Sequence, residues 1–212
     1  MEITWLGHAC FRIRSRDATI LTDPCARSTG YHMGKPTADI VTVSHQHPGH
    51  NWVDGVAGTP RVIYGPGEYE VSNVLITGIR TYHDRQKGAQ RGRNVVYLIE
   101  TEGVRLCHLG DLGHVPSDEQ IEEMSDIGIL FIPVGGGSTI DARTATEVVN
   151  LLEPRLVIPM HYRTEASTAD LAPVDRFLKE MGVSEIQPQA KLSINRSQLP
   201  QQTQVVLLEH RT

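Results

Sequence analysis

Histidines gather in one short segment that directly follows a β-type apolar run. Residues 44–51 read SHQHPGHN, after IVTV. His45 and His47 are two residues apart, so on an extended or loop backbone their rings can face one cation. The proline and glycine that follow supply a bend that could turn His50 toward a second position beside the first. We interpret the segment as metal-binding rather than as a polar turn of solvated imidazoles.

Three further groups with metal-binding chemistry follow other apolar runs. The motif LCHLGDLGH places Asp111 after a run and a glycine, where its carboxylate could reach between two cations or cap the next segment. TYHD and VIPMHYRT place His83 and His161 at the ends of two more runs. Ligand-binding groups in layered α/β folds project from loops at strand ends, so these positions predict one shared site.

The elements that must position these residues are mostly strands. Short β-type runs punctuated by Gly, Pro, Asn and Asp occur at residues 2–7, 10–15, 18–23, 40–45, 61–65, 74–82, 94–101 and 104–110. Buried strands are expected at 126–134 and 155–161, and a last β-type run at 204–209. Helices are expected at 117–124, at 141–152 with Asp141 as its cap, and at 171–182.

Composition predicts one ordinary globular domain. The chain has 212 residues, with 39% hydrophobic and 21% charged, and a net charge of -5 with dispersed Lys and Arg does not favour nucleic acid. No stretch approaches about twenty apolar residues, so neither a membrane span nor a signal peptide is expected. Three cysteines without tight spacing argue against a disulfide framework and favour a cytoplasmic location.

Six motifs, taken in order, resemble the metallo-β-lactamase superfamily, in particular its ascorbate-phosphate lactonase-like and N-acyl phosphatidylethanolamine phospholipase D-like branch. They are WLGHACFRI, ILTDP, SHQHPGH, TYHD, HLGDLGH and IPMHYRT. The resemblance implies an α/β fold, a four-layer αββα sandwich, as a single domain over residues 1–212. It also implies two metal positions that share Asp111: His45, His47 and His83 at one, His50 and His161 at the other. One or two zinc ions are implied, although this donor set also tolerates manganese or iron.

One position departs from the superfamily's HxHxDH motif. Gly49 stands where that motif has an acidic residue, which normally belongs to the second metal. The second position therefore loses a negative charge and should bind its ion more weakly, so a single-metal enzyme becomes an alternative. A non-catalytic member is less favoured, because the other six expected ligands are present.

The remaining histidines and one aspartate have separate interpretations. His8 matches a position near the metal centre and could contact substrate, or be a polar residue at a strand bulge. Asp23 could hydrogen-bond a ligand histidine and fix its tautomer, and His108 could support a ligand or replace one. Three others are expected at the surface without a role: His32, His114 and His210.

Two segments could act on the substrate. The run VGGGSTID at 134–141 could present backbone N–H groups to an anion, and we expect it to shape the pocket. The loop after His83 carries four basic residues that could attract an anionic substrate or form a solvated face: Arg85, Lys87, Arg91 and Arg93.

The chemistry that suits such a site is hydrolysis of an ester, lactone, amide or phosphodiester bond by a metal-bound hydroxide. Asp111 would orient the water and accept its proton, while His161 would help to hold the leaving oxygen or the second ion. The expected partner is a small molecule, and a homo-oligomer stays open. The alternatives are a mononuclear-iron redox or persulfide-handling protein with the same ligands, and a non-enzymatic interaction domain.

Overall fold

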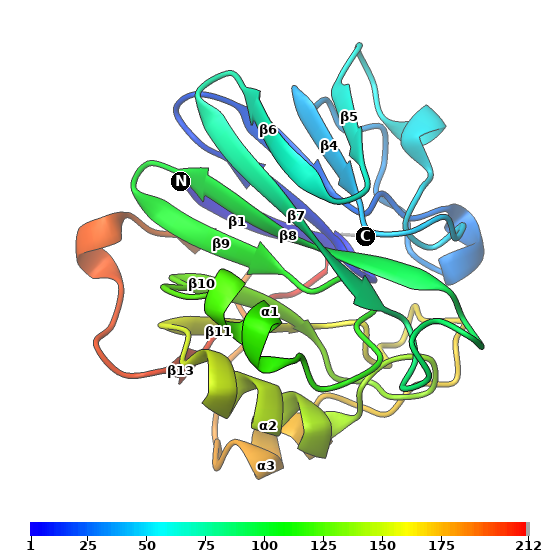
Figure 1. Cartoon of the computed structure of the whole chain (residues 1–212), viewed down its shortest axis with the longest axis vertical. Coiled ribbons are helices and arrows are strands. Elements are labelled where there is room, and N and C mark those ends of the chain that lie inside the picture. The colour runs from blue at the N-terminus through cyan, green and yellow to red at the C-terminus, as the bar shows by residue number, and fades with distance from the viewer. Residues whose placement is uncertain (211–212) are drawn as a thin grey trace.

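Strands dominate the structure and form two mixed sheets (Figure 1). The computed structural model describes residues 1–210. The first sheet has the order β12-β1-β2-β3-β4-β5. Its strands are β1 (Glu2–Gly7), β2 (Cys10–Arg14), β3 (Thr19–Thr22), β4 (Ile40–Val43), β5 (Arg61–Tyr64) and β12 (Leu192–Ser193). The pairs from β12 to β3 are antiparallel, and β3, β4 and β5 are parallel.

The second sheet repeats this change from antiparallel to parallel pairing. Its order is β13-β11-β10-β9-β8-β7-β6, antiparallel from β6 to β9 and parallel from β9 to β13. Its strands are β6 (Gly67–Val71), β7 (Val74–Tyr82), β8 (Arg93–Thr101), β9 (Val104–His108), β10 (Ile129–Pro133), β11 (Leu156–Met160) and β13 (Gln204–Val205). Strands β1, β3 and β4 therefore run the same way within their sheet, as do β7, β9 and β11, so each set ends at one edge.

Alternation of side chains along the first sheet produces two cores. Ile20 and Ile40 join the large core between the sheets, where the rings of Phe11 and Phe131 have centroids 4.5 Å apart. Their neighbours Leu21 and Val41 belong to a smaller core on the outer face, which also contains Cys25, Tyr31, Met33 and Val56. Two segments contribute to this smaller core, and each contains one short 3-10 turn: η1 (Arg27–Thr29) between β3 and β4, and η2 (Val53–Gly55) between β4 and β5.

Helices cover the second sheet. They are α1 (Asp118–Glu123), α2 (Ala142–Leu152) and α3 (Asp175–Glu180), and α2 and α3 lie side by side next to β11 (Figure 1). Val148 and Val149 of α2 belong to the same core as β10 and β11, both of which are buried along their whole length. The predicted α/β sandwich of two sheets is present, with the expected outer helical layer on the first sheet reduced to 3-10 turns. No helix within residues 1–210 is long and apolar enough to cross a membrane.

Three element predictions need correction. Helix α3 begins only at Asp175, because Ala172 donates its backbone N–H to Gly135 and Pro173 forms a bridge with Arg163. The last β-type run pairs regularly only at β13. Strand β6 was not predicted from the sequence, because GEYEV is an edge strand with mostly exposed or half-buried side chains and no apolar alternation.

Candidate metal centre

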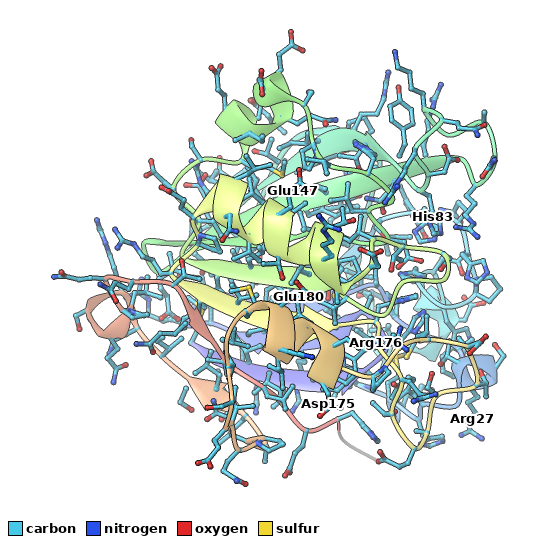
Figure 2. The ribbon with its side chains drawn as sticks, turned by 90° about the horizontal axis from the view of Figure 1, so that it is seen from below. Arg27, His83, Glu147, Asp175, Arg176 and Glu180 are labelled. Carbon is cyan, nitrogen blue, oxygen red and sulfur yellow. The ribbon has the colours of Figure 1, made fainter. Side chains whose placement is uncertain are left out.

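Side chains from both sheets meet where these strands end. The residues that follow strands are His8 after β1, Asp23 after β3, His45, His47 and His50 after β4, His83 after β7, Asp111 after β9 and His161 after β11. Figure 2 shows His83 toward one edge of the molecule, away from Glu147 of α2 and Glu180 of α3. The predicted gathering at strand ends therefore has a structural basis in the common direction of these strands.

The carboxylate of Asp111 lies among four imidazoles. Its Oδ2 is 3.2 Å from Nε2 of His50, 3.2 Å from Nε2 of His83 and 3.9 Å from Nε2 of His45. Its Oδ1 is 3.4 Å from Nε2 of His161. Asp111 is only 2% exposed. One buried carboxylate thus joins histidines contributed by both sheets.

Several buried polar atoms of this cluster have no hydrogen-bond partner among residues 1–210. They are His45 Nε2, His50 Nε2, His83 Nδ1, His161 Nδ1 and Asp111 Oδ1. An unsatisfied buried polar group costs about 1–3 kcal/mol, so native structures rarely keep several together without an ion or water. Imidazole nitrogens and a carboxylate oxygen are ligands for a transition-metal cation. The residues present therefore fit the metal that the sequence predicted.

Three triads have potential ligand atoms within 4.8 Å of one another. Two consist of predicted ligands: His45 with His83 and Asp111, which were assigned to one position, and His45 with His47 and His50, although His50 was assigned to the other position. The third was not predicted and joins His8 to His50 and His161. His47 is exposed, whereas His50 and His161 are buried. The structure brings all six predicted ligands together and adds His8.

The carboxylate of Asp23 holds the histidine loop, residues 44–51, through hydrogen bonds to Ser44 and His50. Its Oδ1 accepts the backbone N–H of Ser44 at 2.7 Å, and its Oδ2 accepts the Ser44 hydroxyl at 2.6 Å. Oδ2 also accepts Nδ1–H of His50 at 2.8 Å, which leaves Nε2 of His50 facing Asp111. Because the single hydroxyl proton of Ser44 goes to Asp23, its Oγ must accept Nδ1–H of His45, 3.0 Å away. Both histidines thereby direct Nε2 toward Asp111.

Asn94, which the sequence analysis missed, fixes the turn that carries Asp111. Its Oδ1 accepts the backbone N–H of Asp111 at 2.9 Å, and its Nδ2 donates to the backbone oxygen of Leu109 at 2.9 Å. Nδ2 also donates to Thr81 Oγ1 at 2.8 Å. Asn94 lies within the apolar strand β8, and Ser44 directly follows the apolar strand β4. A polar residue among apolar neighbours was the only feature of the sequence that could have identified either as part of the site.

Burial and neighbouring charge separate the protonation behaviour of the imidazoles. Burial, followed by the charge of His50, lowers the pKa of His45 to about 3, and burial also lowers the pKa values of His8 and His161. Burial opposes charge at His50 too, but the nearby Asp111 and Asp23 carboxylates raise its pKa to about 10. Burial would raise the pKa of Asp111, yet His161 and His50 hold it well below its usual value. His8, His45 and His161 are therefore neutral and ready to ligate, whereas a cation would have to displace the Nε2 proton of His50.

Two other histidines hold the backbone around the site. His108 donates Nε2–H to Ala9 O at 2.9 Å and accepts Gly110 N–H at Nδ1, so it has no nitrogen left to replace a ligand. His114 was predicted to face solvent, which is wrong. Its Nε2 accepts the backbone N–H of Tyr82 at 3.2 Å, and its Nδ1 donates to Val115 O. It thereby secures the end of the strand that leads to His83.

His210 was also predicted at the surface, and the structure corrects this. Its side chain is 9% exposed, and its ring lies edge-on to Trp5 and Tyr31 while Nε2 is 2.8 Å from Glu165 Oε1. His32 is exposed, as predicted.

The glycine run at 134–141 packs directly against the His161 turn. Gly135 donates its N–H to His161 O at 3.1 Å, and Gly136 donates to Ile140 O at 3.2 Å, so neither amide is free for an anion. A Cβ on Gly135 would collide with His161 O, which explains the glycine there. The four basic residues after His83 are exposed, and Arg91 reaches this run by donating to Gly137 O at 3.2 Å.

One family model and several known proteins are similar to this chain. Residues 2–161 match the family described as a β-lactamase superfamily domain. A UPF0173 protein of Pyrococcus furiosus is 30% identical over 201 residues, covering 85% of this chain and 90% of that one. A UPF0173 metal-dependent hydrolase of Lysinibacillus sphaericus is 27% identical over 195 residues, covering 77% and 86%. The solved structure of a proposed zinc-dependent hydrolase of the metallo-β-lactamase superfamily from Thermotoga maritima is 40% identical, with a TM-score of 0.82 and 99% of both chains covered.

Proposed function

Because the chain belongs to the metallo-β-lactamase superfamily, we propose that it is a metal-dependent hydrolase acting on an ester, lactone or phosphodiester bond of a small molecule. The observation that carries the proposal is the buried Asp111 carboxylate among four imidazoles with unpartnered ligand atoms. If the cluster bound no ion, the free-energy cost of these buried polar atoms without hydrogen-bond partners would not be offset. The branch within the superfamily stays a prediction.

Zinc is the ion we propose. His45, His47 and His83 would hold one position and His50 and His161 the other, with Asp111 between them. A donor set of imidazoles with a single carboxylate suits zinc better than manganese, which prefers oxygen ligands. When bound, such a cation lowers the pKa of a water toward neutrality and polarises a carbonyl or phosphoryl oxygen.

Residues of the chain would orient the attacking water and accept its proton. Asp111 Oδ1 makes no hydrogen bond within residues 1–210, so it is free to orient a water and receive its proton. His161, 3.4 Å from that oxygen, would help to hold the leaving oxygen. Asp23 accepts Nδ1–H of His50, so Nε2 is the nitrogen that would bind the ion once its proton is displaced. The basic residues after His83 favour an anionic substrate.

The test combines elemental analysis with a substrate panel. We expect stoichiometric zinc and hydrolysis of at least one of bis-p-nitrophenyl phosphate, p-nitrophenyl acetate and a simple lactone. Asp111→Asn should lower the bound zinc and reduce the rate by about 100-fold or more, because a shared metal ligand and proton acceptor is lost, whereas exposed His32→Asn should have no effect. One iron per chain with oxygen consumption and no hydrolysis would favour the redox alternative. Absence of metal, with no effect of His47→Ala on any activity, would favour an interaction domain.

A further inference from the structure

His8 fills the space that Gly49 leaves. A Cβ built on Gly49 would lie 2.7 Å from His8 Nε2, 3.1 Å from His8 Cδ2 and 3.4 Å from His47 Nδ1. Contacts below about 3 Å are steric clashes, because packed heavy atoms approach to about 3.5–4.0 Å. A side chain at position 49 would therefore require the imidazole of His8 to move from its present position.

The same imidazole lies against the second metal position. Its ring centroid is 4.2 Å from that of His161 and 4.8 Å from that of His50. Ligand atoms of these three residues lie within 4.8 Å of one another, and all three residues are buried. Among residues 1–210, nothing forms a hydrogen bond with the ring nitrogens of His8. The imidazole is thus buried, next to two proposed ligands and free to bind.

The backbone holds His8 in this orientation at some cost. Its φ of 54° is in the left-handed region, which disfavours non-glycine residues by roughly 1–2 kcal/mol. Its carbonyl oxygen accepts Trp5 Nε1–H at 3.0 Å and the backbone N–H of His161 at 3.2 Å. The turn between β1 and β2 is therefore fastened to the turn that carries His161. A strained conformation kept by such bonds suggests that the direction of the side chain matters.

We propose that His8 is a ligand of the second metal ion and replaces the carboxylate that Gly49 lacks. His50, His161 and Asp111 complete this position, so it has three imidazoles and one shared carboxylate. The proposal rests on the proposed function only in requiring that the site binds metal. Exchange of a carboxylate for an imidazole should shift the preference of this position further toward zinc and away from manganese.

The experiment counts bound zinc rather than turnover. Metal-free full-length protein is titrated with zinc against a chromophoric chelator, and cobalt substitution reports the coordination of each ion by its absorption. The variants are His8→Asn, Gly49→Asp and the double variant; asparagine tolerates a positive φ, so the turn should survive. His32→Asn controls for binding to an exposed histidine.

We expect two ions in the unaltered protein. His8→Asn should weaken the affinity for the second zinc ion by about 100-fold or more and leave the affinity for the first unchanged. Loss of a group that only supports a ligand already costs about 10- to 100-fold, and loss of a ligand should cost at least as much. Gly49→Asp in the same chain should restore the second ion, because the carboxylate then enters the space that His8 had filled. If the double variant fails to fold, added imidazole should restore the second ion in His8→Gly, since glycine also accepts this φ.

The proposal is overturned if the unaltered protein binds one ion, or if His8→Asn retains the second ion with unchanged affinity. Reduced hydrolysis with unchanged zinc binding would instead make His8 a substrate contact, and would also overturn it. Failure of the proposed function looks different, because hydrolysis would be absent while zinc binding still depended on His8.

Discussion

Asn94→Ala tests whether the turn carrying Asp111 is held by one buried amide. The substitution removes the acceptor for the Asp111 N–H and the donor for Leu109 O, both at 2.9 Å, and the 2.8 Å bond to Thr81 Oγ1. Asn94 is fully buried, so the two freed backbone groups have no access to water. The Asp111 turn should loosen, and with it the position of the carboxylate.

The expected magnitude follows from these bonds. Each backbone group left buried and unpaired costs about 1–3 kcal/mol, so Asn94→Ala should lower the free energy of unfolding by about 3–4 kcal/mol. Thr81→Val is a matched control, because it removes the two hydrogen bonds between Thr81 and Asn94, leaves those from Asn94 to Asp111 and Leu109, and should cost about 1–2 kcal/mol. Asn94→Ala should also weaken zinc binding by about 10- to 100-fold, as for other groups that support a ligand, and Thr81→Val should not.

Urea unfolding of the metal-free proteins gives the stabilities, and chelator competition gives the zinc affinities. Equal losses of stability in the two variants, with zinc affinity unchanged in both, would show that Asn94 fills space in β8 and does not position Asp111.

Three further outcomes check other parts of the structure. The backbone N–H of Arg16 donates to Glu102 and lowers the pKa of its carboxyl below the usual 4.5. The hydrogen bond therefore stabilises the folded protein above about pH 4.5, and this contribution is lost as the pH falls through the pKa that Glu102 has in the folded state. Glu102→Gln should lower the free energy of unfolding in urea by about 0.5–1 kcal/mol at pH 7 and by little at pH 3. Tyr97→Phe removes a 3.0 Å hydrogen bond to Val43 O between the sheets and should cost about 1 kcal/mol; an unchanged unfolding midpoint would contradict it. A thiol reagent should modify essentially no cysteine in the native protein and all of them after unfolding, and rapid native reaction would contradict the burial of these residues: Cys10, Cys25 and Cys107.

Sequence patterns could locate the ends of the strands, and with them most of the site. The runs IVTV before His45 and LVIPM before His161 become strands buried along their whole length, and VRLCH before Asp111 becomes a strand buried except at Arg105. Polar residues directly after such strands were the reliable signal. Asp141 was correctly predicted to cap α2, since its side chain accepts Thr144 N–H. Local chemistry decided these features, so local sequence was sufficient.

Long-range contacts were beyond the sequence. His8 and Gly49 are distant along the chain, and only the approach of the β1–β2 turn to the histidine loop brings Nε2 of His8 beside position 49. His108 and His114 are adjacent to the same motif as Asp111, yet both turn their nitrogens to backbone groups. Residue type and spacing cannot distinguish a histidine that binds a metal from one that hydrogen-bonds to the backbone, because the difference depends on which backbone groups surround the ring.

The fold fixes the positions of the proposed ligands before any ion binds, and three strained turns contribute to this. His8, Asp23 and His161 each directly follow a strand and each have positive φ, at 54°, 38° and 51°. This conformation turns the chain sharply, so the side chain points across the strand ends instead of along the sheet. Each is fastened by backbone bonds: Asp23 N–H to Thr42 O, His161 N–H to His8 O, and Gly135 N–H to His161 O. Because these bonds join covalently distant turns and require no ion, the fold itself fixes the positions of the ligands. A cation that binds would then satisfy the buried Nε2 and Oδ1 atoms without reorganising the chain, which is the condition for tight binding at a site that loses one carboxylate.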